Sequence, residues 1–159
     1  SSGQSTNNTT AQNPQSATTT APQSAQDADA NALATLRRWV QHDSSAVGAL
    51  EGQWIAQLSS KKIGTPADYI SWTQVLTNHL YYRQRYPNYA LLLWSNDWLG
   101  SYGPTSKGFF VTIRGVAFPQ PGGVLHWCQH QQWQRGDCFA KRLAKTGDPG
   151  ANVKMLPGT

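Results

Sequence analysis

The sequence predicts an α+β domain. Its expected core is a four-stranded antiparallel sheet in the chain order β-α-β-β-α-β, with two helices on one face and an extra N-terminal helix. The stretch 107–118 has the period-two alternation of a central strand: Phe109, Val111 and Ile113 share one face. Two helical segments, 65–86 and 122–133, interrupt the strand-like stretches in the β-α-β-β-α-β order. The other strand-like stretches are 53–60, 89–94 and 138–143.

Composition divides the chain into four parts. Residues 1–26 carry no charge and no large apolar side chain, so they are expected to form a disordered Ser/Thr/Gln/Ala/Pro linker. Residues 27–52 should hold the N-terminal helix, from about 28 to 42, with Asp43-Ser44 breaking or re-capping it. The sheet domain is expected at 53–145. Residues 146–159 are rich in Gly and Pro and are expected to form a loose tail.

Local signals place the remaining boundaries. Thr65, Pro66 and Asp68 have the pattern of a helix start, and Pro87 is expected to end that helix. The apolar run 89–94 predicts a strand buried on both faces. The segment 95–106 reads as a long loop whose aromatic residues either pack down as a lid or make contacts with a partner.

Net charge narrows the classes of partner. The chain of 159 residues has a formal charge of +5, and charged residues make up only 13% of it. Such a balance suits a nucleic acid, an anionic membrane surface or an anionic cell-wall polymer, and it equally suits solubility alone. No run of eighteen apolar residues occurs, so a membrane association is expected only through an anchor outside this sequence.

The chain has two cysteines, Cys128 and Cys138, with a Gly136-Asp137 turn between them. They could be a pair of buried thiols. We favour a disulfide, because the turn allows the chain to fold back, and a disulfide implies an oxidising compartment.

Catalytic and metal signatures are weak. No carboxylate pair, nucleophile elbow or phosphate-binding glycine loop is visible, so no enzyme and no cofactor is expected. His126 and His130 have the i, i+4 spacing of metal ligands, but Cys128 lies on another helix face. No metal site is therefore predicted.

The second face of the 107–118 strand is the candidate ligand surface. Phe110, Thr112 and Arg114 alternate onto that face and could stack on and hydrogen-bond a ligand. An RNA-recognition domain has the same β-α-β-β-α-β order, and 107–111 echoes the start of its third-strand motif. The match to that motif ends at Phe110, where the motif has a small residue, so RNA binding is kept only as an alternative.

Two stretches resemble the motifs of the SPOR (sporulation-related repeat) family. Trp54-Ile55-Ala56-Gln57-Leu58-Ser59-Ser60 is similar to its first-strand motif, and 110–118 is similar to its third-strand motif. The chain departs from the first motif at Ser59, where Gly is usual, and at Lys61, where an aromatic residue is usual. The resemblance covers about 53–145 and implies a ferredoxin-like or RNP-like unit.

SPOR domains bind peptidoglycan glycan strands, favour strands without stem peptides and localise proteins to the division septum. The resemblance therefore implies an extracytoplasmic module that binds glycan as the sensor or localisation domain of a membrane-anchored protein. We expect the module to be monomeric. The alternative is a protein-interaction domain of a membrane protein or receptor without glycan binding. The candidate ligand residues are Gln57, Ser59, Trp94, Phe110, Thr112 and Arg114.

Overall fold

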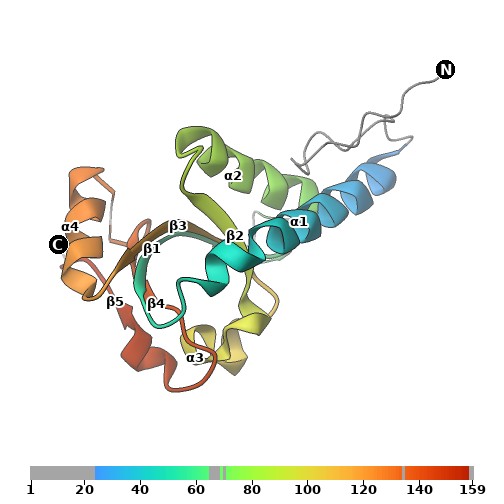
Figure 1. Ribbon diagram of the computed structural model, residues 1–159. Helices are drawn as coiled ribbons and strands as arrows, with labels where there is room; N and C mark the ends of the chain where they lie inside the picture. Colours follow the sequence, from blue (N-terminus) through green and yellow to red (C-terminus); the bar gives the residue numbers. More distant parts are fainter. Residues whose placement is uncertain (1–23, 65–68, 70, 134, 158–159) are drawn as a thin grey trace.

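The structure is a computed structural model that describes residues 24–64, 69, 71–133 and 135–157. It is an α+β fold around one antiparallel sheet, which confirms the predicted class (Figure 1). Most of the predicted linker and the predicted helix start at Thr65, Pro66 and Asp68 lie outside the described residues.

The sheet has five strands in the order β2-β3-β1-β4-β5, and each neighbouring pair is antiparallel. The strands are β1 (Trp54–Lys61), β2 (Ala90–Trp94), β3 (Phe110–Phe118), β4 (Phe139–Arg142) and β5 (Val153–Lys154). The prediction of four strands was therefore one strand short. The fifth comes from the tail that was expected to be loose, where a short 3-10 helix, η5 (Pro149–Asn152), leads into β5. Leu156 then buries its side chain in the core, which supplies the apolar anchor for this segment.

Three helices cover one face of the sheet: α1 (Ala25–Gly48), α2 (Trp72–Arg85) and α4 (Pro121–His130). In Figure 1, α1 runs beside α2 and across β2, while α4 lies at the other end of the sheet over β4. Leu36 and Trp39 of α1 pack with Val75 of α2 against Leu92 and Phe110 of the sheet. The N-terminal helix is thus part of the domain core.

Helix boundaries follow local capping chemistry. The side chain of Ser24 accepts a hydrogen bond from the backbone N–H of Asp27, which caps α1. The predicted break at Asp43-Ser44 is wrong, because Asp43 is buried and bonded to α2, so α1 continues to Gly48. Ser71 and Gln74 form a reciprocal capping box, and α2 accordingly begins at Trp72.

The opposite face of the sheet is also covered. The 95–106 segment folds into η3 (Ser95–Asp97), α3 (Leu99–Tyr102) and η4 (Pro104–Ser106). Trp98 and Tyr102 from this segment pack on Leu93, Val111 and Ile113. Of the two roles considered for these loop aromatics, packing is the one the structure shows. The sheet consequently has no broad open face in the described residues.

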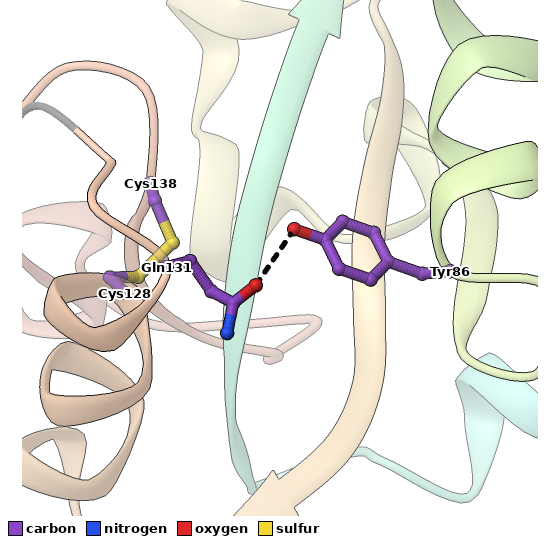
Figure 2. The surroundings of a disulfide bond; sticks show 4 residues. All are labelled: Tyr86, Cys128, Gln131 and Cys138. Atoms are coloured by element: carbon purple, nitrogen blue, oxygen red, sulfur yellow. Dashed lines mark hydrogen bonds between the residues drawn. A yellow bond between two sulfur atoms is a disulfide. The ribbon is translucent and has the colours of Figure 1, made fainter.

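A disulfide joins Cys128 and Cys138 across a Cα–Cα distance of 5.7 Å, as predicted. It ties the C-terminal end of α4 to the start of β4 (Figure 2). Both sulfurs are buried in the same cluster as Val124 and Ala140, so the bridge is part of the core.

Candidate binding site

The predicted ligand surface on β3 is buried. Phe110 is 3% exposed and lies against the rings of Trp72 and Trp94, with centroid distances of 5.6 and 4.9 Å. Thr112 is 1% exposed, and its Oγ1 is 2.8 Å from Nδ1 of His79. The prediction of an exposed row at these positions is wrong. The Thr112 hydroxyl has a partner on α2, and the Phe110 ring packs against other rings. Strand periodicity alone does not reveal such partners.

Three more predicted residues, Gln57, Ser59 and Trp94, do not form the predicted surface with Phe110 and Thr112. Gln57 is on the opposite face of the sheet, where its Oε1 accepts a 2.9 Å hydrogen bond from the Tyr102 hydroxyl. Ser59 donates a 2.5 Å hydrogen bond to Oδ1 of Asn78 on α2. Trp94 lines a cleft beside α1. A β-bulge between Gln57 and Ser59 breaks the strict alternation of β1, so these two side chains do not share a face.

Arg114 is the one predicted residue of β3 that reaches the surface. Its guanidinium lies 4.2 Å from the ring centre of Trp127 and 5.6 Å from that of Tyr89. Burial lowers its pKa below the usual arginine range, yet the group remains a cation at any physiological pH. The ring partners of Arg114 differ from the partners of Gln57 and Ser59, which are Tyr102 and Asn78.

A groove lies where β1 extends past β4. The last β1–β4 pair is Gln57 with Phe139, and in the described part of the chain β1 continues to Lys61 paired with β3 alone. The space beside this free edge, which we call the β1 groove, has a volume of about 320 Å³. It is lined by Gln57, Leu58, Ser59, Ser60, Lys61, Asn78, Tyr82, Gly136, Asp137 and Phe139.

A second groove of about 420 Å³, the α2 groove, runs along the outer face of α2. It is lined by Tyr69, Thr73, Gln74, Thr77, Asn78 and Tyr81. Asn78 lines both grooves. The Lys61 ammonium lies 4.6 Å from the Tyr69 ring, and the rings of Tyr81 and Tyr82 are 5.0 Å apart. We call the two adjoining grooves the α2–β1 trough.

The trough combines ring faces with hydroxyl and amide groups. Tyr81 is 49% exposed, so its ring is available to a ligand. The pKa of Tyr82 is raised to about 12, chiefly by burial and then by the neighbouring Tyr81 and Asp137, so its hydroxyl stays protonated and can donate a hydrogen bond. Two of the six predicted residues, Gln57 and Ser59, line this trough.

Sequence reasoning missed the α2 contribution. Thr73, Thr77 and Tyr81 recur every four residues on one face of α2 and are all exposed. A tyrosine on an otherwise polar helix face was the available signal. Asn78 carried no such signal, because its place beside Ser59 depends on how α2 packs over β1.

The described residues contain neither a metal-binding cluster nor a membrane-spanning helix. No three His, Cys, Asp or Glu side chains of the described segments gather closely enough to hold a metal ion, although the rings of His126 and His130 are 4.3 Å apart. None of the described helices has both the length and the apolar character needed to cross a bilayer.

Comparisons with family models, curated proteins and solved structures gave no match to this chain.

Proposed function

We propose that this chain is a non-catalytic module that binds peptidoglycan glycan strands outside the cytoplasm, with the α2–β1 trough as its site. The observation that carries the proposal is the composition of the trough. Its tyrosine rings stand beside threonine, serine and asparagine side chains on a surface with space for an extended ligand. The parent protein would use the module as a sensor or localisation domain.

The compartment is supported by the disulfide, because cysteine pairs persist in oxidising environments such as the cell exterior. The SPOR resemblance is supported by chain order: β1, α2, β2, β3, α4 and β4 follow one another as strand, helix, strand, strand, helix and strand. The short helices of the 95–106 segment and strand β5 would then be additions to that unit.

A glycan strand matches the trough chemically. The apolar face of a pyranose ring can stack on Tyr81, while its hydroxyl and N-acetyl groups can bond to Thr77 and Asn78. Lys61, beside Tyr69, places a cation near the lactyl carboxylate that is exposed when a stem peptide has been removed. Each contact is modest, and repetition along a polymer raises the overall retention.

The proposal is tested by sedimentation with purified peptidoglycan sacculi, before and after amidase removal of stem peptides. We expect the chain in the pellet, and more of it after amidase treatment. Tyr81→Ala should weaken retention about threefold to tenfold, the usual contribution of one aromatic stacking contact. The control is Leu99→Ala, because Leu99 is an exposed large apolar side chain, at 38%, that does not line the trough.

Neutral chitin oligosaccharides, titrated in parallel, separate sugar recognition from charge. Binding that Tyr81→Ala weakens and Leu99→Ala leaves intact supports the trough as the site. If the chain stays in the supernatant with both kinds of sacculi, glycan binding is refuted. If it binds and Tyr81→Ala has no effect, the trough is the wrong site.

A second candidate, a protein-interaction domain, is favoured by one other surface. A cleft between α1 and the end of β2 is lined largely by Val40, Val47, Trp94 and Trp98, with Asp97 and Lys145 at its rim. Apolar clefts with a polar rim are typical of protein contacts. Failure of sacculus binding, together with loss of partner contact on Val40→Asp substitution, would favour this function.

A further inference from the structure

A row of rings and guanidinium groups runs over the C-terminal end of α2, the start of β2 and α4. The Arg114 guanidinium is near the rings of both Tyr89 and Trp127. The Trp127 ring is 5.6 Å from that of Tyr86, and the Arg85 guanidinium is 5.4 Å from Tyr86. We call these five residues the Arg85–Arg114 surface. They are all at least partly exposed, and the trough described above does not include them.

Neither arginine has an acidic partner within the described chain. The ion pairs there join Asp43 to His42 and to Arg83, so Asp43 is not a partner of Arg85 or Arg114. The Arg85 guanidinium donates to the Tyr81 hydroxyl over 3.0 Å. The Arg114 guanidinium contacts two rings, those of Tyr89 and Trp127. Each guanidinium carries five N–H donors, so both retain the capacity to bind an oxyanion.

The surface is held in place before any ligand arrives. Trp127 is adjacent in sequence to Cys128, whose disulfide fixes the end of α4. Gln131, one turn further along, accepts a hydrogen bond from the Tyr86 hydroxyl over 3.4 Å, which links α4 to the end of α2 (Figure 2). Arg114 projects from β3, which is paired on both sides within the sheet. Such preorganisation reduces the entropy lost on binding.

We propose that the Arg85–Arg114 surface binds the anionic groups of an acidic polysaccharide. A guanidinium accepts a carboxylate or phosphate oxygen pair, while the flanking Tyr89 and Trp127 rings offer faces to the sugar that carries it. Two cations separated by a Tyr86–Trp127 pair suit a polymer with repeated charges. This inference stands on a different surface from the glycan trough and does not rest on it.

The number of cations separates a polysaccharide from a nucleic acid. Nucleic-acid binding gains most of its affinity from many phosphate contacts, and each contact adds about 0.9 to the slope of log K against log salt. Two guanidiniums limit that slope to about 2. A stronger salt dependence would require cations outside this surface.

The experiment is calorimetric titration with oligogalacturonate, whose carboxylates can be methyl-esterified to give a neutral control of the same length. A phosphorylated oligosaccharide tests phosphate as the oxyanion. We expect binding to at least one anionic oligomer, no binding to the methyl ester, and a salt slope near 2. Arg85→Gln and Arg114→Gln should each lower affinity at least fivefold and reduce the slope by about 1.

Arg38→Gln is the control, because Arg38 is exposed on α1 and its substitution removes one positive charge at a different place on the surface. Near-ultraviolet circular dichroism checks that the Arg114→Gln protein is folded; if it is not, the Arg85→Gln result alone decides. An equal loss in Arg38→Gln would show that net charge, and not this surface, is responsible, and would overturn the proposal. So would tighter binding to a single-stranded oligonucleotide with a slope well above 2, or no binding to either anionic oligomer.

The two proposals can fail independently. Tyr81→Ala should leave oligogalacturonate binding intact, apart from any effect of losing the hydrogen bond from Arg85 to the Tyr81 hydroxyl. Tyr81→Phe measures that effect separately, because it removes the hydroxyl and keeps the ring. Loss of sacculus binding by the trough variant therefore says nothing against the anionic surface, and the reverse holds for Arg114→Gln.

Discussion

Asp43 of α1 and Arg83 of α2 form a buried, two-point ion pair. The two guanidinium nitrogens donate to the two carboxylate oxygens at 2.8 and 3.0 Å, and Asp43 is only 2% exposed. The same carboxylate also accepts the backbone N–H of Leu92 over 2.8 Å, and the Arg83 guanidinium stacks 3.5 Å from the Trp39 ring centre. This one carboxylate therefore connects both helices to strand β2.

Asp43→Asn should lower the free energy of unfolding by about 3 kcal/mol, because it leaves the Arg83 cation poorly solvated and without its counter-charge. Urea unfolding at pH 7 measures the change. Glu51→Gln removes an exposed acid and serves as the control, with an expected effect within about 0.5 kcal/mol. The double variant Asp43→Asn with Arg83→Gln should be less destabilised than the sum of the single variants; additive losses would show that the two side chains do not act as a pair.

Removal of the disulfide should affect both stability and the Arg85–Arg114 surface. Cys128→Ser with Cys138→Ser opens a loop of ten residues' separation, for which chain entropy predicts a loss of about 2–3 kcal/mol. Because Trp133 donates its backbone N–H to the Cys128 carbonyl and Trp127 adjoins Cys128, we also expect weaker binding of the anionic oligomer. Unchanged thermal midpoints in the double variant would contradict the structural role of the bridge.

The strands were predictable because their signals are local. The expected limits 53–60, 89–94 and 138–143 differ from β1, β2 and β4 by one residue at most ends. Alternation, apolar runs and the flanking turn residues depend only on nearby sequence. β5 has two residues and no such pattern, since its place depends on pairing with Ala140 and Lys141.

The binding surface was harder to predict because burial is decided by tertiary packing. Phe110 and Thr112 are residue types that occur on partly solvent-exposed sheet faces, but α1 and α2 cover them. Nothing near these positions in sequence indicates that Trp39, some seventy residues earlier, shares their cluster. Arg114 is partly exposed, with its guanidinium beside the Trp127 ring of α4.

His79 makes the fold sensitive to acid. It is 1% exposed, and its Nε2 accepts from Arg83 over 3.0 Å, so the proton of the neutral ring is on Nδ1, facing Thr112. Burial, and then the charge of Arg83, lowers its pKa to about 3, while Asp43 opposes the shift. Above pH 6.5 the ring is neutral in both the folded and the unfolded chain, and below that pH the unfolded chain takes up the proton first.

Stability should therefore fall as pH decreases from 6.5 towards 3, by several kcal/mol from this residue alone. Urea unfolding at intervals across that range measures the slope. In His79→Gln the slope should be shallower, whereas His126→Gln, which removes an exposed histidine, should leave it unchanged. Identical slopes for wild type and His79→Gln would mean that His79 is not the group responsible.

Lys141 should make the stability of the fold depend on pH in the alkaline range. It is 9% exposed, and its Nζ donates to the Ser101 carbonyl over 3.0 Å and lies 4.7 Å from the Tyr102 ring centre. Burial lowers its pKa to about 8, below the usual value of 10.5. Between these two values the unfolded chain holds more protons than the folded one, so stability should rise with pH from about 8 to 10.

Replacing this lysine tests the argument, since Lys141→Met removes the buried charge and keeps most of the apolar stem. The rise between pH 8 and 10 should disappear, and stability at pH 7 should increase by about 1–2 kcal/mol, because the relief of desolvation exceeds the loss of one hydrogen bond.

Above pH 10 the raised pKa values of Tyr82 and Tyr102 act in the other direction, since the unfolded chain then loses protons first. Urea unfolding from pH 7 to 9.5 stays clear of that range. Lys154→Met, at an exposed position of β5, provides the control, and a wild-type rise that persists in Lys141→Met would assign the dependence to another group.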